Sequence, residues 1–149
     1  MFKTILVAVD GSPDGDRAFD LARSMTTQEA ARLVIVHVTE FVGGKGGTYP
    51  LAADDDDFKA KIQAQAEKLR AEGVKAEVVL ESIRLGGPAH VIAEIAESVA
   101  ADLIVVGTRG RSPLGELVLG SVPIRLLQVA HRPVLVVPPP TGENGRTDS

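Results

Sequence analysis

Five short runs of apolar residues recur along the chain, and polar residues, glycine or proline separate each run from the next. Unbroken apolar runs of this length are typical of β-strands that are buried on both faces of a sheet. The runs occupy residues 4–9, 33–38, 74–80, 103–106 and 134–137, and the run at 74–80 is the least apolar of them. The pattern therefore predicts five strands.

Between these runs, apolar residues recur every three or four positions, which is the spacing of an amphipathic helix. Ser12-Pro13, Gly87-Pro88 and Ser121 stand where the first, third and fourth helices would begin, with Ser12 and Ser121 as N-caps. The four predicted helices would bury Ala18, Leu21, Ala22 and Met25, then Phe58, Ile62, Ala66 and Leu69, then Val91, Ile92, Ile95, Ala96 and Val99, and finally Ile124, Leu127 and Val129.

Strands that alternate with helices imply a parallel sheet joined by right-handed crossovers. We therefore expect a single doubly wound α/β sandwich, with a five-stranded parallel sheet in the order 3-2-1-4-5 and helices on both faces. The domain would span residues 1–138, and the polar tail at 139–149 would be disordered.

The segment 39–57 fits neither the strand nor the helix period and is predicted to be a loop. It contains a glycine-rich stretch at 43–47 and four consecutive aspartates at 54–57. The aspartates favour the positive end of the helix that would begin near Phe58.

Composition narrows the class of protein. The chain has 149 residues, 44% of them hydrophobic and 24% charged, which fits one globular domain. It contains no cysteine, which excludes disulfides and thiol chemistry, and its net charge of −4 argues against nucleic-acid binding. No apolar run approaches the ~18 residues of a membrane helix, and the N-terminus lacks the apolar stretch of a signal peptide. We expect a cytoplasmic protein with no membrane partner.

The segment after the fourth predicted strand has the glycine spacing of a phosphate-binding loop. Gly107 and Gly110 are followed, after nine residues, by Gly120-Ser121. Glycine lets main-chain amides approach an anion closely, and the free amides at a helix start attract negative charge. Arg109 adds positive charge to the loop, and the Ser121 hydroxyl could donate to a phosphate.

Asp10 directly follows the first predicted strand. Ligands of doubly wound sheets bind beyond the carboxyl ends of the strands, where the winding direction changes. If that point lies between the first and fourth strands, Asp10 lies beside Gly107. A carboxylate there can accept hydrogen bonds from ribose hydroxyls, although Asp also favours turns and helix starts. Val38, which ends the second strand, could border a base pocket or be an ordinary core valine.

Three segments together carry a family resemblance. They are the glycine spacing just described, the sequence VAVDGS at 7–12 and the sequence PVLVV at 133–137. By these segments the chain resembles the universal stress protein family over roughly residues 2–138, and the glycine spacing is that of the family's ATP-binding branch.

The resemblance implies that the protein binds ATP and acts as a switch or sensor in the stress response, not as an enzyme. Any Mg²⁺ would be held through the phosphates, and no metal is assigned to protein ligands. The residues that would contact the nucleotide are Asp10 and Gly107 at the ribose, Ala8, Val9 and Val38 at the adenine, and Gly110, Gly120, Ser121 and Val122 at the phosphates, with Arg109 nearby. The resemblance also implies a homodimer paired through the fifth strand, Val134–Val137, and a protein partner that the sequence does not identify.

Two other functions stay open at this point. One is a nucleotide-free dimeric module that docks partner proteins, and the other is a slow ATPase with Asp10 as the nearest carboxylate. No lysine follows Lys75, so the glycine loop carries no P-loop-type lysine, and no G-x-S-x-G nucleophile elbow occurs. His37 stands within an apolar strand and is interpreted as a core residue whose hydrogen bonds are satisfied.

Overall fold

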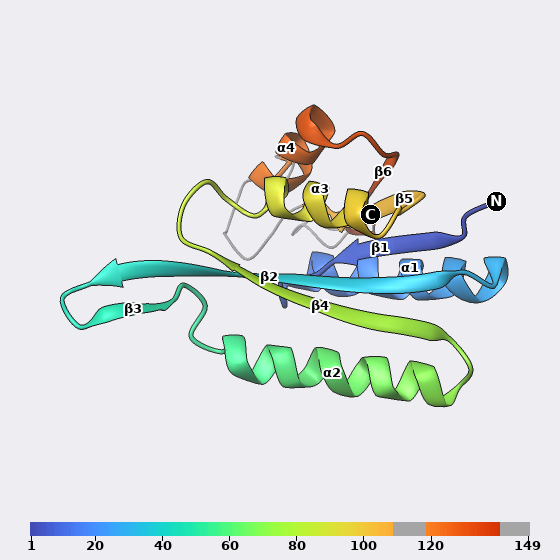
Figure 1. Cartoon of the computed structure of the whole chain (residues 1–149), viewed down its shortest axis with the longest axis horizontal. Helices are drawn as coiled ribbons and strands as arrows, with labels where there is room; N and C mark the ends of the chain where they lie inside the picture. The colour runs from blue at the N-terminus through green and yellow to red at the C-terminus, as the bar shows by residue number, and fades with distance from the viewer. Residues whose placement is uncertain (109–118, 141–149) are drawn as a thin grey trace, which may run out of the picture.

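Six strands form the sheet of the computed structural model, which describes residues 1–108 and 119–140 (Figure 1). They are β1 (Thr4–Ala8), β2 (Arg32–Gly44), β3 (Gly47–Pro50), β4 (Lys75–Ile83), β5 (Leu103–Gly107) and β6 (Val134–Val137). In parallel, β2 pairs with β1 and β4, β1 pairs with β5, and β5 pairs with β6. The predicted α/β class is confirmed. The five predicted strands correspond to β1, β2, β4, β5 and β6. One further strand, β3, was not predicted, and it pairs antiparallel with β2.

Four helices cover the two faces of this sheet within the described residues. They are α1 (Pro13–Glu29), α2 (Asp55–Ala71), α3 (Ala89–Ser98) and α4 (Ser121–Val129). Side chains of α1 and α2 pack with Ile5 and Val7, whereas side chains of α3 and α4 pack with Leu6. Successive strand residues point to opposite faces, and here both faces are covered. This double cover explains why β1 is apolar from Ile5 to Ala8 instead of alternating.

The segment predicted to be a loop at 39–57 contains a β-hairpin, so that prediction is wrong. β2 continues to Gly44 and pairs with β3 from Phe41↔Pro50 to Gly44↔Gly47. Gly47 has φ of +110°, a conformation that residues with a side chain rarely adopt. The glycines thus build a tight turn between two strands. The hairpin projects beyond the body of the sheet in Figure 1, and the chain returns from it to begin α2 at Asp55, earlier than predicted.

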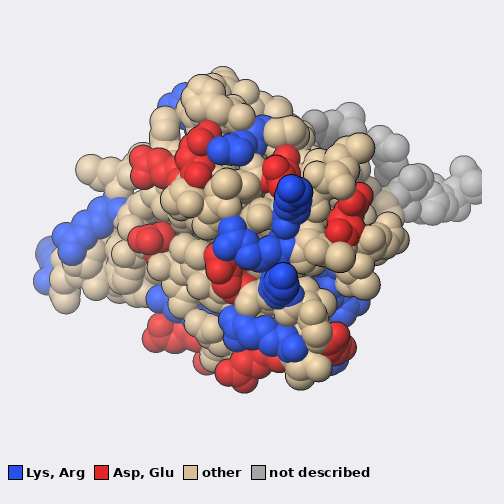
Figure 2. Space-filling model, turned by 45° about the vertical axis from the view of Figure 1, so that its right-hand side comes forward, with Lys and Arg blue, Asp and Glu red and all other residues tan. Residues whose placement is uncertain are grey.

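The surface carries charges of both signs. Figure 2 shows one face of the molecule, on which Lys and Arg side chains lie among Asp and Glu side chains. None of the helices in the described part of the chain has the length and apolar character needed to cross a membrane.

Candidate functional site

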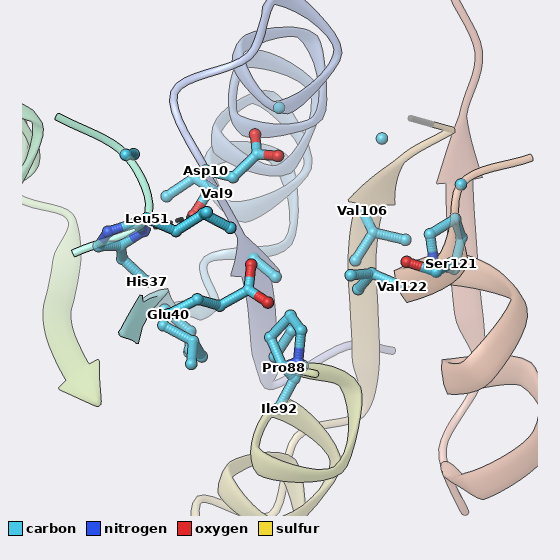
Figure 3. A pocket seen from close by; sticks show the side chains of 18 of the residues that line it. Val9, Asp10, His37, Glu40, Leu51, Pro88, Ile92, Val106, Ser121 and Val122 are labelled. Atoms are coloured by element: carbon cyan, nitrogen blue, oxygen red, sulfur yellow. Dashed lines mark hydrogen bonds between the residues drawn. The ribbon is translucent and has the colours of Figure 1, made fainter. Parts of the chain in front are cut away.

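A cavity of about 460 Å³ opens at the carboxyl ends of β1 and β5, beside residues 36–40 of β2 (Figure 3). The chain leaves β1 towards α1 on one face, and it leaves β5 towards the other face, which carries α4. The cavity therefore lies where the winding direction changes, the usual ligand site of this architecture. Its volume falls in the range of small-molecule sites, roughly 300–1,000 Å³.

The structure brings most of the predicted site residues together around this cavity. The lining includes Ala8, Val9, Asp10, Val38, Gly107, Gly120, Ser121 and Val122. Arg109 and Gly110 lie outside the described residues. The contacts assigned to each of these residues remain predictions.

Asp10 lies in a tight turn that leads from β1 into α1. Its Oδ1 accepts hydrogen bonds from the Ser12 amide at 3.0 Å and the Ser12 hydroxyl at 2.5 Å. The Ser12 hydroxyl in turn accepts from the Gly15 amide at 3.0 Å, so Ser12 caps α1 as predicted. A side chain at Gly15 would place its Cβ 2.9 Å from Asp10 Oδ1. The glycine therefore leaves the space that the Asp10 carboxylate occupies at the rim of the cavity.

Gly107 has a packing reason that is independent of any ligand. A Cβ at this position would lie 2.7 Å from the backbone of Asp14, in the first turn of α1. The neighbouring Thr108 hydroxyl donates to Asp14 Oδ2 at 2.9 Å, and the Thr108 carbonyl accepts from the Gly120 amide at 2.6 Å. The end of β5 is thus held against α1 on one side and against the start of α4 on the other.

The N-terminus of α4 borders the cavity. The prediction that Ser121 caps this helix is wrong: Gly120 is the N-cap, in extended conformation, and Ser121 is the first helical residue. First-turn amides of a helix have no acceptor within the helix, so those of Ser121 and Val122 are suited to an anion. Pro123, the third helical residue, contributes no amide.

A buried hydrogen-bonded pair, His37 and Asp55, closes the opposite wall of the cavity. His37 is 5% exposed and Asp55 is 3% exposed. His37 Nδ1 lies 3.0 Å from the Val9 carbonyl oxygen, and Nε2 lies 2.6 Å from Asp55 Oδ1. Asp55 Oδ2 accepts from the Thr39 hydroxyl at 2.9 Å and lies 3.2 Å from Lys59 Nζ. The interpretation of His37 as a satisfied core residue is confirmed.

These partners define the charge of Asp55. Burial raises the pKa of Asp55, but the hydrogen bonds from His37, Thr39 and Lys59 outweigh burial and hold that pKa below its ordinary value. Asp55 is therefore a carboxylate that accepts hydrogen bonds inside the cavity wall.

Sequence reasoning missed several residues of the cavity wall. They are Gly15, Val36, His37, Glu40, Leu51, Ala52, Asp55, Pro88, Ile92, Val106 and Pro123. Helical spacing had assigned Ile92 to the core, and the acidic run had assigned Asp55 to a helix terminus. Leu51 and Ala52 carried no signal, because only the return of the chain from the hairpin brings them to the cavity. Among the residues that the structure describes, no three His, Asp or Glu side chains gather as metal ligands.

The fold and the cavity define a doubly wound α/β protein with a ligand-sized site at the point where the winding changes. A sequence model of the universal stress protein family matches residues 1–138. A universal stress protein of Thermus aquaticus, from the 3′ region of QAH/OAS sulfhydrylase, is 40% identical over 142 residues, which cover 92% of this chain and 99% of that protein. The chain belongs to the universal stress protein family.

Two solved structures have related folds and carry nucleotides. One is a universal stress protein in complex with cAMP, 28% identical, with a TM-score of 0.65 and coverage of 91% of this chain and 97% of that chain. The other is the universal stress protein from Archaeoglobus fulgidus in complex with dAMP, 25% identical, with a TM-score of 0.61 and the same coverage of 91% and 97%.

Proposed function

We propose that the cavity binds an adenine nucleotide, ATP as the family resemblance implies, and that the protein acts as a nucleotide-dependent switch or sensor in the stress response. One observation carries the proposal: the two ends of a single cavity have different chemistry. The Asp10 carboxylate lies at one end, where it suits hydroxyl donors, and the first-turn amides of α4 lie at the other, where they suit an anion.

The proposed orientation of the nucleotide follows from this polarity. The base would lie among the apolar side chains of Val9, Val38 and Leu51, and the ribose would lie at Asp10. The phosphates would lie at the start of α4, beside Gly120, and would carry any Mg²⁺. The cAMP and dAMP of the two related structures both contain adenine, which supports this class of ligand.

The test is calorimetric titration of MgATP into nucleotide-stripped protein, with GTP and FMN as comparison ligands. We expect one site per chain with Kd at or below ~100 μM, about −5.5 kcal/mol. Gly120→Val brings a branched side chain to the phosphate end, at a backbone conformation that any residue can adopt, and abolishes binding. Gly43→Val is the matched control, because a Cβ at Gly43 has no neighbour within 4 Å, and it leaves binding unchanged.

The outcomes separate the alternatives. Folded wild-type protein that gives no heat with ATP refutes the proposal and favours a nucleotide-free interaction module. Unchanged ATP affinity in Gly120→Val refutes the placement of the phosphates. Steady phosphate release that disappears in Asp10→Ala would identify a slow ATPase in place of a switch.

We also infer a homodimer paired through β6. This strand pairs with β5 on one side and ends the sheet, and all four of its residues are only partly buried. An apolar edge strand of this kind invites pairing with another strand, and a second copy of the chain offers a matching one.

A further inference from the structure

Glu40 enters the cavity from a fixed position on β2. Its backbone carbonyl accepts a hydrogen bond from the Leu51 amide at 2.6 Å, and it is paired with Ile83 of β4. Glu40 is therefore the last residue of β2 that pairs with β4, just before the hairpin leaves the sheet. Figure 3 shows its carboxylate in the cavity, between the β1 side marked by Val9 and the α3 side marked by Pro88.

The other acidic side chains of the cavity wall are already engaged. Asp55 accepts from His37 and Thr39, and Asp10 accepts from Ser12. Among the residues that the structure describes, no hydrogen bond or ion pair is formed by the Glu40 carboxylate. We call the part of the cavity lined by Val9, Val38 and Leu51 its apolar end. The Glu40 carboxylate lies on the wall there, is exposed to solvent, and has acceptor capacity for a ligand.

We propose that Glu40 selects the base, by accepting a hydrogen bond from the exocyclic amino group of a 6-aminopurine. The proposal rests on the proposed function, because it requires the base to lie at the apolar end of the cavity. A carboxylate accepts and cannot donate, so it attracts an amino group at C6 and repels the carbonyl oxygen that a 6-oxopurine carries at the same atom. The adenine of cAMP and dAMP in the two related structures favours this partner over the ring N1–H of a 6-oxopurine.

The experiment compares ATP with ITP, which differ only in the amino or oxo group at C6 and in the proton at N1. Calorimetry measures Kd for both nucleotides with the wild type, Glu40→Gln, Glu40→Ala and the control Glu67→Gln. Glu67 is exposed on α2 and is no part of the cavity wall, so its substitution removes the same charge at a distance.

The wild type and Glu67→Gln bind ATP more tightly than ITP. In Glu40→Gln the side-chain amide can donate to O6 as well as accept from an amino group. The ATP-to-ITP affinity ratio therefore falls about tenfold or more in this variant, as expected for the loss of a hydrogen bond to a charged group. Glu40→Ala weakens ATP by a similar factor and does not weaken ITP.

Two results would overturn the role of Glu40, and a third, different result would refute the proposed function itself. An ATP-to-ITP ratio that is equal in the wild type and Glu40→Gln, with intact ATP binding, removes the role of Glu40 alone. A wild type that binds ITP more tightly than ATP shows that the carboxylate accepts from the ring N1–H of a 6-oxopurine, which also overturns the proposal. A folded wild type that binds neither nucleotide refutes the proposed function, and the role of Glu40 falls with it.

Discussion

The buried hydrogen-bonded pair of His37 and Asp55 offers the sharpest prediction about stability. Replacing Asp55 with Ala removes the acceptor of His37 Nε2 and of the Thr39 hydroxyl, and also the charge partner of Lys59. Two buried polar groups then have no acceptor in a wall where His37 is 5% exposed and Thr39 is 2% exposed. Asp55→Ala should therefore destabilise the fold far more than loss of an aspartate at the surface.

The expected magnitude follows from the burial of both partners. Leaving a buried donor without its acceptor costs about 1–3 kcal/mol, and Asp55→Ala leaves two, so the expected loss is about 2–6 kcal/mol. Loss of a carboxylate from the first turn of a helix costs only about 0.3–1 kcal/mol through the helix dipole. Asp56 lies in the same first turn of α2 but is exposed, so Asp56→Ala isolates the helix-dipole contribution.

Urea and thermal denaturation, followed by circular dichroism at pH 7, measure the difference. We expect Asp55→Ala to lower Tm by about 4–24 °C, at roughly 2–4 °C per kcal/mol for a chain of this size. Asp56→Ala should lower it by no more than a few degrees. Equal losses in the two variants would refute the argument that the buried pair stabilises the fold.

The pair also has a defined dependence on pH. The pKa of Asp55 is lowered in the folded state, because its hydrogen bonds outweigh burial. Its carboxylate therefore contributes stability at pH values above the ordinary pKa of 3.8, and this contribution is lost as the pH falls through the folded pKa. The gap in stability between the wild type and Asp55→Ala should therefore be full at pH 7 and shrink on acidification below pH 3.8. Urea denaturation of the wild type and Asp55→Ala at pH 7 and below pH 3.8 measures this gap, and a gap that does not change with pH would contradict the role of the Asp55 charge.

Two further predictions concern the framework of the sheet. Gly107→Ala places a Cβ 2.7 Å from the Asp14 backbone and should lower the free energy of unfolding, measured by denaturation, by about 1–3 kcal/mol, as overpacking does. The control Gly43→Ala should lower it by less than about 1 kcal/mol. Equal losses would contradict the close approach of α1. Asp102 Oδ2 accepts from the amides of residues 3 and 4 at 2.8 and 3.0 Å, and these hydrogen bonds hold its pKa below the ordinary value of 3.8. Asp102→Ala should cost about 1–2 kcal/mol at pH 7. That loss should fade as acid protonates the wild-type carboxylate below pH 3.8, and a loss that persists there would indicate another cause.

The sequence predicted the parallel strands because both faces of the sheet are covered. Full burial favours unbroken apolar runs, as at residues 5–8 of β1 and throughout β5, and such runs can be recognised without any tertiary information. The glycines predicted the place of the cavity for a related reason. Gly107 is needed where the end of β5 meets the backbone of α1, and close approach of that kind restricts the residue type in the sequence itself.

The hairpin and the buried pair of His37 and Asp55 could not be predicted in this way. Glycine at 43–47 is compatible with a flexible loop as well as with a tight turn, and only the pairing of Phe41 to Gly44 with β3 decides between them. Asp55 is one of four consecutive aspartates, and nothing local distinguishes it from Asp56. Its partner lies eighteen residues earlier, on the far side of the hairpin.

The two ends of the cavity differ in the same way, because one is formed by backbone atoms and the other by side chains. The proposed phosphate end is built from backbone at Gly107, Gly120 and the first turn of α4, so its chemistry depends on conformation and is visible as glycine spacing. The proposed base end is built from side chains, among them Glu40, Leu51 and Asp55, that the hairpin and its return bring together. Selectivity for the base should therefore change with substitutions at residues 40–55, whereas binding of the phosphates should not. A chain can keep the glycine spacing and still select a different ligand, because the two ends are specified by different segments and by different physical means.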